Sequence, residues 1–189
     1  MSELLGGITL GGKYGGYELI NQPATSMPQD LASGFYIAQE GFVDSSFEPI
    51  YIVGKQVVNG INYFVIAEQT LVIEHQHPIK RIVGMVINIP PKSIGGKNAK
   101  IIDIVTSEVP RIPVEIEKPL KEELAKLVGA NNKPIALIGT QVVKGTNYFV
   151  VGESTAAAVV PNAEPHAILI TLNVFNDKAT LKINNLVEE

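Results

Sequence analysis

The sequence contains no cysteine and no tryptophan, and the missing cysteine alone sets several functional classes aside. A chain without cysteine has no disulfide scaffold, no thiolate nucleophile, and no zinc-ribbon or iron–sulfur ligands. Its stability must therefore come from packing. The absence also fits a reducing compartment, and we expect a cytoplasmic protein.

Long apolar runs and dense charge clusters are missing as well. No stretch approaches the roughly 18 consecutive apolar residues of a membrane-spanning helix, and Met1–Gly7 lacks the basic start and apolar run of a signal peptide. The sequence leaves open whether a leader was removed. Fifteen Lys and Arg face nineteen Asp and Glu, and no basic cluster is denser than Lys80-Arg81. We therefore expect neither a membrane nor a nucleic-acid partner.

The sequence motifs of common catalytic sites are also absent. There is no Gly-x-Ser-x-Gly nucleophile motif and no cluster of histidines and carboxylates at metal-ligand spacing. Gly95-Gly96-Lys97 lacks the upstream glycine and the following hydroxyl residue of a phosphate-binding loop. We expect no enzyme, no cofactor and no metal site.

An internal repeat is the clearest positive feature. Glu48-Pro-Ile-Tyr-Ile-Val-Gly-Lys-Gln-Val-Val-Asn-Gly-Ile-Asn-Tyr-Phe-Val-Ile-Ala-Glu68 aligns with Lys133-Pro-Ile-Ala-Leu-Ile-Gly-Thr-Gln-Val-Val-Lys-Gly-Thr-Asn-Tyr-Phe-Val-Val-Gly-Glu153, with 12 of 21 positions identical at an offset of 85. The same offset carries Asn88 onto Asn173. Two copies of one fold are the simplest interpretation.

The proline-rich segment 107–113 separates the two copies. Each of its prolines removes a backbone donor and interrupts a regular hydrogen-bond ladder. We therefore expect a first domain over residues 1–109, with a glycine-rich N-terminal segment, and a second domain over residues 112–189.

The apolar spacing predicts one helix and several strands in each copy. Helices are expected over residues 28–42 and 119–128, where apolar side chains recur every three or four residues. Strands are expected over 50–58, 81–89 and 99–105 in the first copy and over 135–143, 167–175 and 179–184 in the second, with a further strand after each turn. These elements predict an α+β fold in which each helix covers a curled antiparallel sheet.

A turn is expected between the first two strands of each copy. Asn59-Gly60 is the dipeptide that favours a type I′ turn, because that turn needs a positive φ at both central residues. Lys144-Gly145 occupies the matching place in the second copy.

These two hairpins resemble the Gln-x-Val-x-Gly hairpin of the cystatins, and the order of glycine-rich start, helix and hairpins is similar to that family. The resemblance implies two tandem cystatin-like domains. In that family, an N-terminal trunk and two hairpin loops form a wedge that plugs the active-site cleft of papain-like cysteine peptidases. It therefore implies a non-covalent inhibitor that acts by occlusion.

The resemblance assigns a peptidase-binding set in each copy. In the first copy the trunk is Gly11 and Gly12, with Gly15-Gly16 as the alternative trunk. The first loop is Gln56, Val57, Val58, Asn59 and Gly60, and the second loop is Pro90 and Pro91. In the second copy the set comprises two loops: Gln141, Val142, Val143, Lys144 and Gly145; Val174 and Phe175. The family's second loop carries a Pro-Trp pair, and this chain has no tryptophan, so part of that contact is missing.

Three alternatives stay open beside inhibition of cysteine peptidases. The chain could be a tandem scaffold or protein-binding module without inhibitory activity, or a latexin-like inhibitor of another peptidase class. Alternatively, the repeat could keep the hairpin only because the fold needs its turn, with Asn62-Tyr63 and Asn147-Tyr148 serving strand packing. A homo-oligomer formed by hairpin exchange is also compatible with the sequence.

Overall fold

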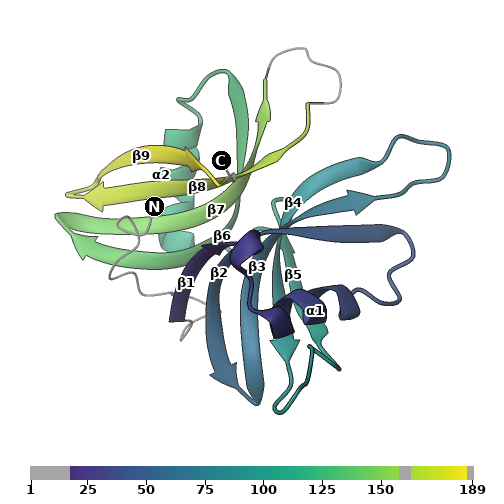
Figure 1. The fold of residues 1–189 in the computed structure, drawn as a ribbon. Coiled ribbons are helices and arrows are strands. Elements are labelled where there is room, and N and C mark those ends of the chain that lie inside the picture. Colours follow the sequence, from purple (N-terminus) through teal and green to yellow (C-terminus); the bar gives the residue numbers. More distant parts are fainter. Residues whose placement is uncertain (1–17, 158–162, 187–189) are drawn as a thin grey trace. The chain divides into compact units, whose positions relative to one another are not determined.

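The structure is a computed structural model, which describes residues 18–157 and 163–186. Its strands form two antiparallel sheets, one in each sequence copy (Figure 1). The chain divides into two compact units between Ile104 and Val105. We describe each unit by itself.

The first sheet has five strands, in the order β1-β2-β3-β4-β5. The elements of this copy are β1 (Glu18–Pro23), a 3-10 turn η3 (Ala24–Ser26), α1 (Gln29–Ile37), β2 (Ser45–Val58), β3 (Gly60–Leu71), β4 (Ile79–Ile89) and β5 (Lys100–Thr106).

The second sheet has four strands, in the order β6-β7-β8-β9. The elements of this copy are α2 (Val114–Leu124), β6 (Ala130–Val143), β7 (Gly145–Ala156), β8 (His166–Phe175) and β9 (Lys178–Asn185).

The two copies share their strand register as well as their element order. The pairing of β2 with β3 shifts between Pro49 and Tyr51 and again between Ile52 and Gly54. The pairing of β6 with β7 shifts at the two matching places, 85 residues later. Such bulges bend a strand and change which face its side chains occupy. The repeat therefore preserves the curvature of the sheet as well as its sequence.

Equivalent apolar residues form the core of each copy. Leu31 and Phe35 of α1 are fully buried and pack on a cluster that includes Ile52, Val65 and Met85. The residues 85 positions later form the matching cluster in the second copy: Ile116, Leu120, Leu137, Val150 and Ile170. Burying side chains of this size contributes about 1.5–3 kcal/mol each, so these positions fix the fold.

The expected α+β class is wrong. Among the described residues, 56% lie in strands and 14% in helices, and the two α-helices found there are short. The prediction took one helix covering a sheet in each copy as enough for the α+β class, whereas the strands dominate: β2, β3, β6 and β7 have 12 to 14 residues each. In the described part of the chain, no helix is long and apolar enough to cross a membrane.

The second helix also lies elsewhere than expected. The sequence pattern predicts a start at Pro119, because proline is favoured in the first helical turn. The helix begins at Val114 instead and contains Pro119 in its interior. Its buried residues are Ile116 and Leu120, whereas Leu127 and Val128, which belonged to the expected apolar stripe, are exposed.

The expected type I′ turn at Asn59-Gly60 is wrong as well. Gly60 and Gly145 have φ values of +99° and +90°, but Asn59 has no positive φ. A turn with both central residues at positive φ lies instead between β8 and β9, at Asn176 (φ +48°) and Asp177 (φ +59°). Asparagine and aspartate are the side chains that tolerate this conformation best after glycine.

The close approach at Gly60 gives a stability test. A Cβ atom at Gly60 would lie 2.2 Å from the carbonyl oxygen of Ile89, whereas one at Gly41, which has a similar φ of +101°, would meet nothing within 4 Å. We expect Gly41→Ala to cost about 1 kcal/mol for backbone strain alone. Gly60→Ala should cost about 3 kcal/mol, because β4 must also shift. Urea unfolding followed by circular dichroism measures both, and equal losses would show that the close approach carries no energy.

Candidate functional site

The turn between β2 and β3 presents apolar side chains to solvent. Val57 is 79% exposed and Val58 is 44% exposed, and Asn59 and Gly60 complete the turn. Each of these side chains would gain free energy if a partner covered it, because apolar surface would leave water. This turn is therefore a candidate contact surface.

The start of the β4–β5 loop lies against the same turn. The position that a Cβ of Gly60 would occupy is 3.0 Å from the Cα of Pro90. Pro90 is half-buried there and Pro91 is exposed. The structure thus brings together the two loops that the sequence assigned to one site. We name this set, Val57 to Gly60 with Pro90 and Pro91, the first tip.

The second copy builds the equivalent surface from the same Val-Val-x-Gly turn and a different second loop. Val142 is 86% exposed, Val143 is 45% exposed and Phe175 is 37% exposed. A Cβ of Gly145 would lie 2.3 Å from the carbonyl oxygen of Val174, so the two loops again meet at a glycine. We name this set, Val142 to Gly145 with Val174 and Phe175, the second tip.

A line of three amide side chains supports the first tip from behind. The Asn62 Nδ2 donates to the Gln56 Oε1 over 3.3 Å, and the Asn88 Nδ2 donates to the Asn62 Oδ1 over 2.8 Å. These residues face each other across β2, β3 and β4. We call this arrangement the amide ladder. It ties the three strands together immediately behind the exposed valines.

The second copy repeats the amide ladder with the same geometry. The Asn147 Nδ2 donates to the Gln141 Oε1 over 3.3 Å, and the Asn173 Nδ2 donates to the Asn147 Oδ1 over 2.8 Å. The Asn173 Nδ2 also lies 3.4 Å from the Lys144 carbonyl oxygen, which links the ladder to the turn. Gln56 and Gln141, assigned above to peptidase binding, thus have a structural role in the strands.

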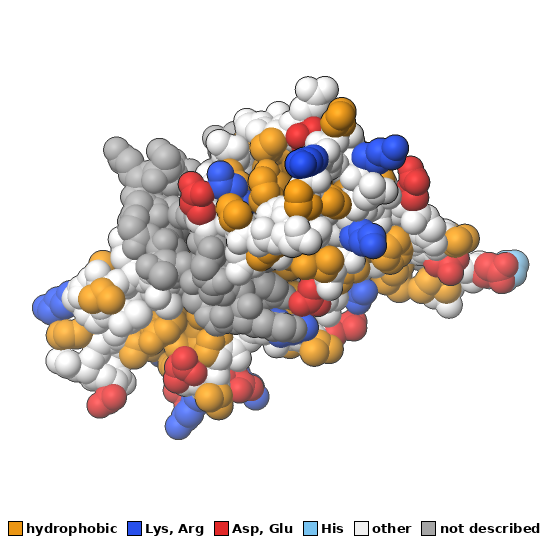
Figure 2. Space-filling view, turned by 90° about the horizontal axis from the view of Figure 1, so that it is seen from below, with side chains coloured by type: hydrophobic (Ala, Val, Ile, Leu, Met, Phe, Trp, Pro, Cys, Tyr) orange, Lys and Arg blue, Asp and Glu red, His pale blue; other side chains and the backbone are white. Residues whose placement is uncertain are grey.

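The two tips differ in charge. The first tip has no ionisable side chain. In the second tip, the Lys144 Nζ lies 5.3 Å from the centre of the Phe175 ring, a cation–π contact. On the face drawn in Figure 2, charges of both signs lie among apolar side chains, without a broad area of one sign. The first tip therefore offers an uncharged apolar contact, and the second tip adds one positive charge to such a contact.

Two predicted site residues lie outside the described part of the chain, and two residues with a structural role were not predicted. Gly11 and Gly12, the expected trunk, fall outside the described residues. The roles of Asn62 and Asn88 in an amide ladder were not expected, although both recur at the offset of 85. Among the described residues, no group of three or more histidines and carboxylates could hold a metal ion.

No known family model and no curated protein sequence matches the chain. The resemblance to the cystatins therefore rests on the two hairpin segments and on the order of elements around them.

The amide ladder predicts a stability loss at its centre. Asn62 is 9% exposed, and its replacement leaves the Gln56 oxygen and the Asn88 amide without this partner. We expect Asn62→Ala to lower the free energy of unfolding by about 2 kcal/mol. Asn59→Ala, the same change at an exposed position of the same hairpin, should change it by less than about 0.5 kcal/mol. Urea unfolding measures both losses, and equal losses would show that the amide ladder does not stabilise the fold.

Proposed function

We propose that this chain is a non-enzymatic protein-binding module that docks through the first and second tips. The observation that supports this proposal is the exposure of paired valines on a supported turn in both copies. Val57 and Val142 are the most exposed of these, at 79% and 86%. The two copies keep this exposure although they differ elsewhere.

The energetics of association favour such a tip. Covering an exposed apolar side chain gains about 25 cal/mol per Å² removed from water. The amide ladder and the close approach at Gly60 and Gly145 hold the loops in place before a partner arrives. A preformed surface loses less conformational entropy on binding than a flexible one.

Charge placed on the tips tests this proposal. Val57→Asp and Val142→Asp together should abolish binding, because an aspartate buried against an apolar partner loses its hydration without a counter-charge. The stability should change by less than about 0.5 kcal/mol, since both valines are exposed. Val72→Asp is the matched control, because Val72 is 58% exposed and lies outside both tips.

The readout is affinity capture from a lysate followed by mass spectrometry, with self-association measured in parallel by light scattering. A protein retained by the wild type and by Val72→Asp, and lost from the double variant, supports docking through the tips. If every captured protein survives the double variant, the tips are not the binding surface. If the double variant instead dissociates a dimer, the partner is a second copy of this chain.

Inhibition of papain-like cysteine peptidases is the second candidate function. The specific observation in its favour is that the Gln-Val-Val-Asn-Gly turn lies against Pro90, so that two loops form one apolar edge. A narrow uncharged edge of this kind can enter a peptidase cleft. The likeness of this turn to the cystatin hairpin is informative about function only at Val57, Val58 and Asn59, because Gln56 and Gly60 also have structural roles.

Titration of papain with the full chain tests this candidate. We expect residual activity to fall with added wild type, and to stay unchanged with the Val57→Asp/Val142→Asp variant. Gly60→Glu is unsuitable here, because its side chain would collide with β4 and confuse unfolding with loss of contact. Full papain activity at micromolar wild-type protein would reject the peptidase as partner and leave the docking proposal to the capture experiment.

A further inference from the structure

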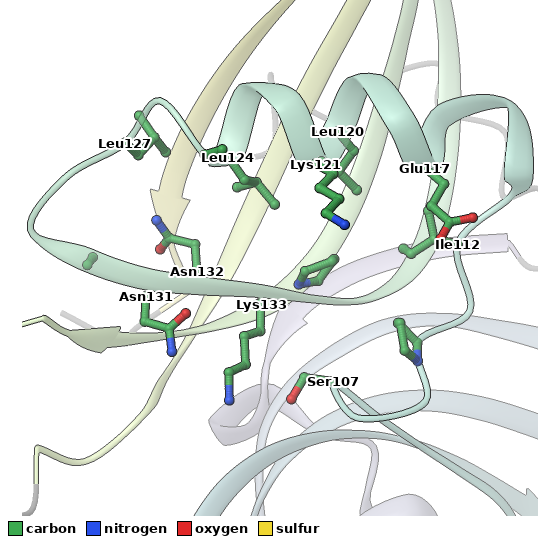
Figure 3. A pocket seen from close by; sticks show the side chains of 14 residues that line it. Ser107, Ile112, Glu117, Leu120, Lys121, Leu124, Leu127, Asn131, Asn132 and Lys133 are labelled. Carbon is green, nitrogen blue, oxygen red and sulfur yellow. The ribbon is translucent and has the colours of Figure 1, made fainter.

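The beginning of β6 is bordered by α2. A cleft of about 710 Å³ lies between this helix and the first residues of the strand (Figure 3). Leu120 and Leu124 line it from the helix, and Asn132 and Pro134 line it from the strand. The first copy has Phe47, which is 1% exposed, at the place of Asn132. Among the residues of β6, none beyond Pro134 lines the cleft, so the rest of the strand has other neighbours.

The middle of β6 pairs with one residue of the link between the copies. The Arg111 N–H donates to the Ile135 carbonyl oxygen over 2.8 Å, and the Leu137 N–H donates to the Arg111 carbonyl oxygen over 3.1 Å. This contact covers the edge of β6 that faces away from β7, up to Leu137. Beyond it, no strand of the described residues pairs with Gly139 or Thr140 on that side. A strand edge of this kind can accept the backbone of another extended segment.

In the first copy, β1 covers the same edge of the sheet. Glu18 lies opposite Lys55 of β2, and Leu19 lies opposite Gly54. The Lys55 Nζ lies 3.4 Å from the Glu18 Oε2, so an ion pair also joins the two strands. The outermost strand therefore fits its neighbour in side-chain charge as well as in backbone pairing.

The second copy uses the matching residues elsewhere. At the offset of 85, β1 corresponds to residues 103–108. The first four of these lie in β5, where they complete the first sheet beside β4. The second sheet accordingly has four strands, whereas the first has five. The repeat thus leaves the second copy without its own equivalent of β1.

A second segment with the pattern of β1 stands nine residues upstream. Gly15-Gly16-Tyr17-Glu18-Leu19 contains the pattern Gly-Gly-x-x-Leu, and Gly6-Gly7-Ile8-Thr9-Leu10 repeats it. The pattern occurs nowhere else in the sequence. The upstream segment includes an isoleucine and a threonine, whose β-branched side chains favour strands. Its residues lie outside the described part of the chain.

The likeness of the two segments gives a register on β6. Thr9 takes the place of Glu18, and at the offset of 85 Thr140 takes the place of its partner Lys55. Where the first copy pairs glutamate with lysine, this register pairs threonine with threonine, which is a favourable cross-strand pair. The leucine that follows again lies opposite a glycine, Gly139. The change on one strand is therefore matched by the change on the other.

We propose that residues 8–10 form an additional strand on the outer edge of β6, at Gly139 and Thr140 of the same chain. Seven residues, 11–17, join this segment to β1, and four of them are glycines. A short flexible connector keeps the segment at a high local concentration, which favours pairing within one chain over pairing with a second copy. The proposal does not depend on the function proposed for the tips. It makes Gly11 and Gly12 a connection between two strands instead of a free trunk.

Disulfide trapping tests the pairing, because the chain has no native cysteine to interfere. Opposite residues of an antiparallel pair have Cα atoms about 4.5–5.5 Å apart, which a disulfide can bridge. We expect Thr9→Cys/Thr140→Cys to form a disulfide within one chain when it is treated with oxidised glutathione. Glu18→Cys/Lys55→Cys is the positive control, since these residues lie opposite each other. Thr9→Cys/Thr180→Cys is the negative control, because the exposed Thr180 lies on β9, at the opposite edge of the sheet.

Non-reducing electrophoresis and peptide mapping measure the outcome. The Thr9→Cys/Thr140→Cys disulfide should form at least about tenfold faster than that of the negative control. The proposal is overturned if the pair does not cross-link, or if it cross-links no faster than the negative control. A disulfide that joins two chains would also overturn it and would make a second copy the occupant of the edge.

Proline substitution gives a second test without new cysteines. Thr9→Pro/Leu10→Pro removes two adjacent backbone donors, one of which faces β6 in any register. The amides of residues 138–142 should then exchange with deuterium about tenfold faster than in the wild type. Lys13→Pro/Tyr14→Pro makes the same change in the connector and should leave this exchange unchanged. Unchanged exchange in Thr9→Pro/Leu10→Pro would show that the upstream segment does not cover this edge.

Discussion

The side-chain amide of Asn62 is buried, and this constraint governs the end of the sheet where the first tip lies. A buried amide is costly unless its donor and acceptor are both paired. Asn62 meets this requirement through Gln56 on one side and Asn88 on the other. A shift of one residue in either strand pairing would break a bond and turn the core side chains outward. The amide ladder therefore fixes the register on which the core and the exposed valines depend.

The amide ladder and the glycines change how the repeated Gln-Val-Val-x-Gly segment is understood. The glutamine supplies the first acceptor of the ladder, and the glycine permits the close approach of the next loop. Two of the five positions are thus explained by the fold without any partner. The valines are not, because Val57 and Val142 contribute little to the packing of their own sheet. The functional information in the segment lies in the valines.

The internal repeat located the elements of the fold correctly, whereas residue preferences at helix starts and turns did not. The offset of 85 aligned both hairpins, and extended outward it carries the start of α1 at Gln29 onto Val114, where α2 begins. The preference for proline at a helix start led instead to Pro119. The Asn59-Gly60 turn was misjudged for a related reason, since its backbone follows from contact with β4 rather than from its own two residues. The cleft could not be foreseen, because it arises from what fills the space beside it.

The two copies differ most informatively where one core position is no longer apolar. Phe47 belongs to the core cluster of the first copy. Asn132, at the matching position, does not belong to the core cluster of the second copy. An empty cavity beside a core would lose contacts on all its walls. The cleft at this place in the second copy is lined by polar as well as apolar side chains, among them Asn132 and Leu124. The first copy is closed at this place by Phe47 and by the hydrogen bonds of Gln39, for which the second copy has Asn132 and Leu124.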